Sequence, residues 1–181
     1  MKKLHPSFAN PDTWRGNIKE EISKEQWKEI RLKILERDKY TCQYCGFKAE
    51  KWQIVHHIDG NPNNNTENNL ETICPMCNLI HHADQGCVVQ SVVDLYRQSK
   101  YSQNEIIQIT RKMRAQGKSD QEIISYLGLK DKASFKMKRE YLEKLFGFVT
   151  SRKTDGWTQK SLEYGYQNTS AEDNQKLSGF K

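Results

Sequence analysis

The sequence predicts an α+β protein whose small core is held by a metal-binding knuckle and is followed by a mainly helical region. Two pairs of cysteines, Cys42/Cys45 and Cys74/Cys77, share the C-x-x-C spacing of metal knuckles. Short strand-like runs and polar turns lie between the pairs, and apolar residues recur at helical spacing on both sides. Because only 35% of the residues are hydrophobic, we expect the core to need a metal ion for stability.

Along the chain these features predict four segments. They are an N-terminal arm over residues 1–23, a metal-binding domain over 24–100, a helical region over 101–150 and a polar tail over 151–181. The arm contains two of the four prolines and has no clear hydrophobic period, so we expect an irregular wrap there.

The first helix is predicted to begin after Ser23 and to end near Asp38. Ser23 and Gln26 have the spacing of a capping box, in which each side chain bonds the backbone amide of the other residue. The apolar face of this helix is formed by Trp27, Ile30, Ile34 and Leu35. Residues 40–55 then contain two short strand candidates, and residues 59–69 form an Asn-rich loop.

The region after Gln103 has the sequence outline of a helix-turn-helix. A first helix is expected to end at Gly117, and a second, capped by Ser119, to end at Gly128. A third, basic helix is expected over residues 132–146. This arrangement predicts a module that binds DNA or docks a partner.

Charge is distributed unevenly along the chain. The net charge of +6 and the pI of about 9.0 suit a polyanionic partner. Residues 130–160 contain 9 Lys and Arg against 4 Asp and Glu, whereas residues 38–85 contain 3 against 6. We expect phosphate contacts from Lys132, Lys136 and Arg139, which would share one face of the third helix; a solvated basic face is the alternative.

The sequence also favours an intracellular protein without a membrane span. No run of 18 apolar residues occurs, and the charged residues Lys2 and Lys3 are not followed by an apolar stretch. We therefore expect a cytoplasmic protein. Because thiols stay reduced there, the cysteine pairs indicate metal binding rather than disulfides.

The four paired cysteines are predicted to hold a structural zinc ion. Cys42, Cys45, Cys74 and Cys77 offer four thiolates, which match a closed tetrahedral site. The alternative is that these cysteines are simply buried. The fifth, Cys87, has no obvious partner and is interpreted as a small buried hydrophobic residue.

Four histidines lie next to the cysteine pairs. His56 and His57 are enclosed by the pairs, and His81 and His82 follow the last cysteine. Their clustering beside a predicted metal site indicates a second metal centre, although four hydrogen-bonded core histidines are the alternative.

The motifs over about residues 25–83 resemble the HNH, or His-Me finger, endonucleases that carry a zinc knuckle. The resemblance rests on Trp27-x-x-Ile30-Arg31, Leu35-Glu36-Arg37-Asp38-x-Tyr40-Thr41-Cys42-x-x-Cys45-Gly46, Val55-His56-His57-Ile58, Asn69-Leu70, Cys74-x-x-Cys77 and His82. It covers less than half of the chain. The resemblance implies a ββα-metal fold, in which a β-hairpin and a helix clasp the metal.

The same resemblance implies a role for each matching residue. His56 would bind the catalytic metal, His57 would be the general base, and Asn69 would pin the loop. His82 would be the second histidine ligand, and Asn78 stands where the family often has a histidine ligand. An amide oxygen ligand favours Mg²⁺ or Mn²⁺, whereas the retained histidines tolerate Zn²⁺, Ni²⁺ or Co²⁺.

With these ligands, His81 would point away from the metal. Asn78 and His82 are four residues apart on the predicted helix and so share one face, while His81 would project elsewhere.

The resemblance implies hydrolysis of double-stranded DNA to 5′-phosphate and 3′-hydroxyl ends. The added helical region would then select the site, as in restriction or homing enzymes, and a palindromic cutter would need a homodimer. Two alternatives remain open at this point. One is a nuclease effector directed by a protein partner, and the other is a non-catalytic DNA-binding protein that keeps the zinc knuckle for folding.

Overall fold

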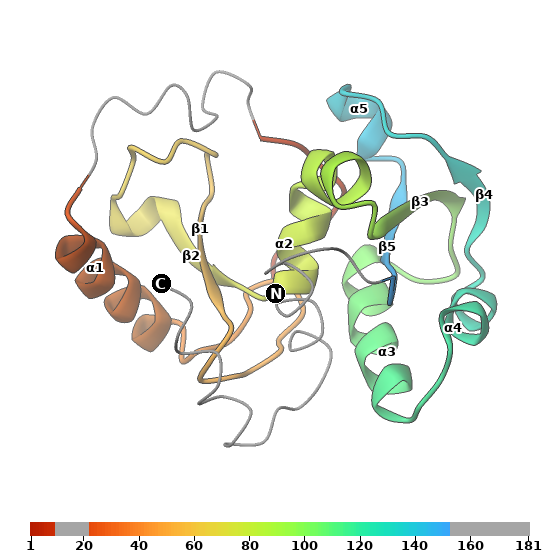
Figure 1. Cartoon of the computed structure of the whole chain (residues 1–181), viewed down its shortest axis with the longest axis horizontal. Helices are drawn as coiled ribbons and strands as arrows, with labels where there is room; N and C mark the ends of the chain where they lie inside the picture. The colour runs from red at the N-terminus through yellow and green to blue at the C-terminus, as the bar shows by residue number, and fades with distance from the viewer. Residues whose placement is uncertain (10–21, 153–181) are drawn as a thin grey trace.

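The computed structural model describes residues 1–9 and 22–152 of the chain, and Figure 1 shows the arrangement of its elements. The helix α1 and the strands β1 and β2 lie at one end, and β3, β4, β5, α3 and α4 lie at the other, with α2 between them (Figure 1). The arm expected over residues 1–23 and the tail expected over 151–181 fall largely outside the described residues.

The helix α1 (Lys24–Arg37) has the bounds and the cap that the sequence predicts. The Ser23 hydroxyl accepts a hydrogen bond from the Gln26 amide at 3.1 Å, and the Gln26 side chain accepts one from the Ser23 amide at 3.0 Å. The buried residues Ile34 and Leu35 pack against the first hairpin. This contact fixes α1 beside the strand that carries the paired histidines.

The hairpin and helix that the metal-finger resemblance implies are present. The strands β1 (Ile54–His57) and β2 (Leu70–Ile73) pair antiparallel, and α2 (Pro75–His81) follows directly. The loop between the strands ends in a 3₁₀ helix, Glu67–Asn69. Where the sequence predicts two short strands over residues 40–55, the structure has the isolated bridge between Thr41 and Lys48 and the start of β1.

A three-stranded sheet dominates the other end of the molecule. The central strand β3 (Val93–Gln98) pairs antiparallel with β4 (Lys130–Ala133) and with β5 (Phe146–Val149). A short π-helix, Asp84–Val89, precedes β3. The helices α3 (Gln103–Ala115) and α4 (Asp120–Leu127) pack with this sheet around the fully buried Phe148.

Both helices of this region begin with a serine cap, and the one at Ser119 is the cap that the sequence predicts. Ser102 caps α3 and Ser119 caps α4, each through a capping box with a glutamate. Gly128 ends α4 with φ of +63°, the left-handed conformation that glycine adopts most easily.

The third helix predicted over residues 132–146 is wrong. The segment forms β4, a loop, the short helix α5 (Arg139–Leu142) and the start of β5. Between Lys132 and Lys138 apolar and polar residues alternate, which is the period of an extended chain, and the spacing of the basic residues hid that pattern. The strand β3 pairs with β4 along one edge and with β5 along the other, and this pairing holds both ends of the segment in an extended conformation.

A continuous core joins the two ends of the molecule. It contains residues of the knuckle, of α2, of β3 and of β5, together with Leu4 from the N-terminal segment. Residues 1–9 run without regular structure along this core, where the Ser7 amide donates to the Ile80 carbonyl at 3.2 Å. Among the described residues, no helix is both long enough and apolar enough to cross a membrane.

Candidate functional site

The four paired cysteines converge in one buried cluster. Their sulfur atoms all lie within 4.8 Å of one another, and the Cys45 and Cys74 sulfurs are 3.6 Å apart. A tetrahedral zinc ion with Zn–S bonds of about 2.3 Å would separate its sulfurs by roughly 3.8 Å. The cluster Cys42, Cys45, Cys74 and Cys77 therefore fits a structural zinc ion, as the sequence predicts.

Local backbone geometry brings these sulfurs together. Gly46 has φ of +74° and its amide donates to the Cys42 carbonyl at 3.0 Å, which closes the turn around the first pair. Cys74 is the N-cap residue of α2 and Pro75 occupies the first turn, so that Cys77 lies on the same turn of the helix. A hydrogen bond from the Cys45 thiol lowers the pKa of Cys42, which favours its thiolate.

Three histidines form a second cluster at the C-terminal end of α2. His56 comes from β1, and His81 and His82 come from the C-terminal end of α2. The His56 ring centroid lies 4.5 Å from that of His81 and 5.1 Å from that of His82, and one ligand nitrogen from each lies within 4.8 Å of the other two.

Four ring nitrogens of this cluster have no hydrogen-bond partner among the described residues. Both ring nitrogens of His56 and the Nδ1 atoms of His81 and His82 are buried without a hydrogen bond to any described residue. Buried polar atoms are rarely left unpaired in proteins. The cluster therefore fits a metal ion held by imidazole nitrogens.

The expectation that His81 points away from the other histidines is wrong. The helix α2 ends at His81, and His82 has φ of −109° and ψ of 61°, outside the helical region. The two neighbouring side chains therefore do not follow the fixed angular step of a helix, and both reach His56.

Burial keeps two of these histidines neutral. Burial, with a smaller contribution from the nearby His56, lowers the pKa of His81 to about 4 and that of His82 to about 3. At neutral pH both rings carry a free lone pair, which a metal ligand needs.

Glu71 is a site residue that the sequence interpretation missed. The hairpin register places it opposite His56, and its carboxylate oxygen lies 3.6 Å from the His56 Nδ1 atom. Burial alone would raise its pKa, but the contacts with His56, Lys2 and Tyr44 lower it to about 2. Only the pairing of the two strands reveals this residue, because nothing in its own motif marks it.

The side chain of His57 leaves β1 on the face opposite to His56. Trp27 of α1 stacks on its ring, with centroids 5.7 Å apart and planes at 10°. Its Nε2 atom lies 2.9 Å from the Asn65 Oδ1 atom. Because an amide oxygen can only accept, Nε2 carries the proton and Nδ1 has the free lone pair.

Asn69 holds the loop between the strands. Its side-chain amide donates to the Asp59 carboxylate at 2.9 Å and to the Asn64 carbonyl at 2.8 Å, and its Oδ1 atom accepts from the Asp59 amide at 3.1 Å. These three bonds tie Asp59 and Asn64 of the loop to the residue that precedes β2.

Asn78 lies on α2, one turn before His82. Its carbonyl accepts a hydrogen bond from the His82 amide at 2.8 Å, and the residue is half-buried. A ligand role for its amide oxygen stays a prediction.

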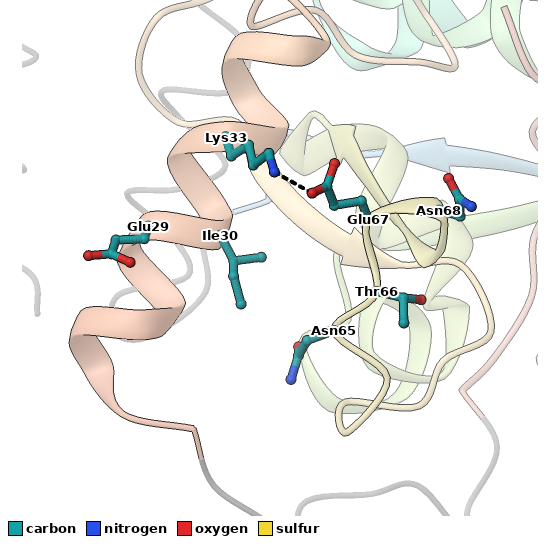
Figure 2. Close-up of a pocket in the computed structure, with 7 residues that line it drawn as sticks. All are labelled: Glu29, Ile30, Lys33, Asn65, Thr66, Glu67 and Asn68. Atoms are coloured by element: carbon teal, nitrogen blue, oxygen red, sulfur yellow. Dashed lines mark hydrogen bonds and ion pairs between the residues drawn. The ribbon is translucent and has the colours of Figure 1, made fainter.

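An open cleft of about 720 Å³ lies between α1 and the loop that bears Asn65. Figure 2 shows Ile30 and Lys33 on the α1 side, and the ion pair from Lys33 to Glu67 joins the two walls. Asn65 lines the cleft and also contacts the ring of His57. The predicted base therefore contacts a residue that lines the open cleft.

The three predicted phosphate contacts do not share a helix face. Lys132 is on β4 and its ammonium lies 3.1 Å from the Asp94 carboxylate. Lys136 is in the following loop, and Arg139 begins α5 and donates to the Ser7 hydroxyl at 3.2 Å. Lys132 and Arg139 therefore already have partners within the protein.

Comparison with known proteins identifies the domain that contains both clusters. The family model of the HNH endonucleases matches residues 42–84. Type 4 apparatus protein DotN of Legionella pneumophila subsp. pneumophila is 41% identical over 70 residues, which are 39% of this chain and 32% of DotN. The match thus spans about a third of that relative. Residues 42–84 are an HNH endonuclease domain, built on a cluster of four cysteines.

Proposed function

We propose that this chain is a metal-dependent endonuclease that hydrolyses double-stranded DNA at the HNH domain. The observation that carries the proposal is the convergence of three imidazoles with buried nitrogens that lack hydrogen bonds, near a fourth histidine whose partner Asn65 lines an open cleft. A purely structural knuckle needs the cysteines but none of these histidines.

His57 is the proposed general base. With its Nε2 proton directed to Asn65, its Nδ1 atom can accept a proton from the attacking water. Stacking on Trp27 and the bond to Asn65 fix the ring before substrate binds. Asn69 contributes by holding the loop that carries Asn65.

His56 and His82 are the proposed ligands of the catalytic metal, with His81 or Asn78 as the third. When bound, the metal would stabilise negative charge on the phosphorane and on the leaving 3′-oxygen, so that the products carry 5′-phosphate and 3′-hydroxyl ends. Three imidazoles favour Zn²⁺, Ni²⁺ or Co²⁺, whereas a site completed by Asn78 favours Mg²⁺ or Mn²⁺.

The remaining parts of the proposal concern the partner and the setting. Lys132, Lys136 and Arg139 stay proposed phosphate contacts because of the excess of basic residues around β4 and α5. Double-strand cutting at a palindrome would need a homodimer. A reducing, intracellular setting is included because the four-cysteine site needs free thiolates.

Cleavage of supercoiled plasmid tests the proposal. We expect nicking or linearisation by the wild type with Mg²⁺, Mn²⁺, Ni²⁺ or Co²⁺, none with EDTA, and loss of about 10²–10⁴-fold in His57→Ala. Glu36→Ala is the control, since Glu36 is exposed on α1 and lies outside the domain. Cleavage that persists unchanged in His57→Ala would remove this histidine from the mechanism.

A second candidate is a protein that acts within an assembly. The observation that favours it is the likeness to DotN, which is named as an apparatus protein. In this case the HNH domain would work only with a protein partner or would serve as a folded module. Binding of DNA without cleavage under any metal condition would favour this candidate over the first.

A further inference from the structure

The helix α3 directs three side chains onto the knuckle from outside the HNH segment. Asn104, Gln108 and Arg111 are spaced four and three residues apart, so they share one face of the helix. The Asn104 amide donates to the Tyr44 carbonyl at 2.5 Å, and the Gln108 amide donates to the Cys45 carbonyl at 2.9 Å. Both contacts hold the turn of the first cysteine pair.

Arg111 reaches the sulfur cluster itself. Its Nη2 atom donates to the Cys74 sulfur at 3.4 Å, and its Cζ atom lies 3.6 Å from the centre of the Phe47 ring. The Nε and Nη1 atoms of this guanidinium are buried and have no hydrogen-bond partner among the described residues. A guanidinium stays protonated in proteins, so a positive charge is buried beside the four thiols.

The negative charge of a zinc-loaded four-cysteine site explains why Arg111 lies beside it. Zinc with four thiolates has a formal charge of about −2. Removing such a centre from water is costly unless a charge of the opposite sign is near, and the attraction is strong where the effective dielectric constant is low. Arg111 meets this need, because it donates to one sulfur while Phe47 supports the flat face of its guanidinium.

We propose that Arg111 is the positive counter-charge of the zinc–tetrathiolate centre, so that α3 is part of the zinc site although it lies outside the HNH domain. The inference does not depend on nuclease activity. It requires only that the four-cysteine cluster holds zinc. Its alternative is that Arg111 merely fills space against Phe47.

Measuring the zinc affinity of the whole chain distinguishes a counter-charge role of Arg111 from a packing role. We compare wild type, Arg111→Met and Lys112→Met by competition with a chromophoric chelator of known affinity. Loss of a group that hydrogen-bonds a metal ligand typically reduces metal affinity about 10–100-fold, and we expect this loss in Arg111→Met. Lys112 is exposed on the same helix, so Lys112→Met removes the same charge without the contact and should match the wild type.

The absorption spectrum of the Co²⁺-loaded protein provides a second test, because a change in packing alone should not shift its bands. The energies of the sulfur-to-cobalt charge-transfer bands depend on the charge near the sulfurs. We expect these bands to shift in Arg111→Met and to stay in place in Lys112→Met. Wild-type zinc affinity and wild-type bands in Arg111→Met, with lower stability of the zinc-free protein, would overturn the proposal.

A second variant covers the case in which Arg111→Met does not fold. Arg111→Lys keeps the positive charge but not the planar group. Retention of most of the zinc affinity in Arg111→Lys supports the counter-charge. A loss of tenfold or more in a folded Arg111→Lys protein overturns it, because charge would then not be what the site requires.

Discussion

At the scale of single residues, His56 depends on a second layer of contacts. Its ring is buried between α2 and the hairpin, and the nearest carboxylate is that of Glu71 on the paired strand. Tyr44 donates to the same carboxylate at 2.6 Å, and Lys2 forms an ion pair with it. A carboxylate behind a histidine ligand fixes the ring and makes its lone pair more basic. Glu71 is therefore a positioning residue for the proposed metal ligand.

Glu71→Gln is expected to weaken metal binding at the histidine cluster about 10–100-fold, because the amide that replaces the carboxylate is neutral. Titration of zinc-loaded protein with Ni²⁺ or Co²⁺, followed by calorimetry, measures this directly. Glu67→Gln is the matched control, since Glu67 is an exposed glutamate of the same hairpin with its own ion pair. Equal affinity in wild type and Glu71→Gln would show that His56 needs no carboxylate.

At the scale of elements, α1 is attached to the hairpin by its C-terminal end. Asp38 is the C-cap residue, and its carboxylate accepts from the Thr72 amide at 2.8 Å and from the Arg37 guanidinium at 2.8 Å and 3.1 Å. Burial alone would raise its pKa, but these donors lower it below the usual value. One ionised side chain thus joins the end of α1 to β2.

This contact predicts a pH-dependent part of the stability. Because the pKa of Asp38 is lower in the folded state, its contribution is complete above the unfolded value of about 3.9 and is lost as the pH falls through the folded value. Asp38→Asn should lower the free energy of unfolding by about 1 kcal/mol at pH 7, measured by urea titration.

The difference between wild type and Asp38→Asn should decrease as the pH falls below about 4. Glu36→Gln on the exposed side of α1 is the control and should show no such change. A difference that stays constant down to the acid transition would mean that the amide side chain, and not the charge, determines the effect.

At the scale of the whole molecule, the four-cysteine cluster lies inside the core that joins the two ends. The sulfurs of Cys74 and Cys77 contact the same buried group of residues as β3, β5 and Leu4. Metal binding at such a site is coupled to folding, because the unfolded chain does not present four thiolates together. Loss of zinc should therefore affect the sheet of the C-terminal half as well as the HNH domain.

Removal of zinc by a strong chelator is expected to lower the thermal midpoint and to reduce the circular dichroism of the whole chain. Cys77→Ser should bind less zinc and unfold at a lower temperature. Cys87→Ser is the control: burial raises the pKa of Cys87 to about 12, and this thiol lies outside the cluster. Full zinc content and an unchanged midpoint in Cys77→Ser would contradict a structural role for the ion.

Residue patterns predicted much of the fold. The two C-x-x-C pairs predicted the knuckle, and Ser23 and Ser119 mark helices that the structure confirms. These features depend on chemistry within a few residues, such as a side chain that caps a nearby amide, and therefore can be recognised in the sequence.

Only the tertiary structure revealed the features that depend on contacts between residues far apart in the chain. The two ends of residues 132–146 are extended because they pair with the two edges of β3, and an isolated pattern of lysines could not show this. Glu71 faces His56 only through strand pairing, and Arg111 reaches Cys74 only because α3 folds back onto the knuckle. The sequence by itself determined the grouping of the four cysteines and the capped helices, since both follow from residue type and short spacing. The groups that surround those ligands were decided by tertiary packing, because contacts between distant segments leave no periodic trace in the sequence.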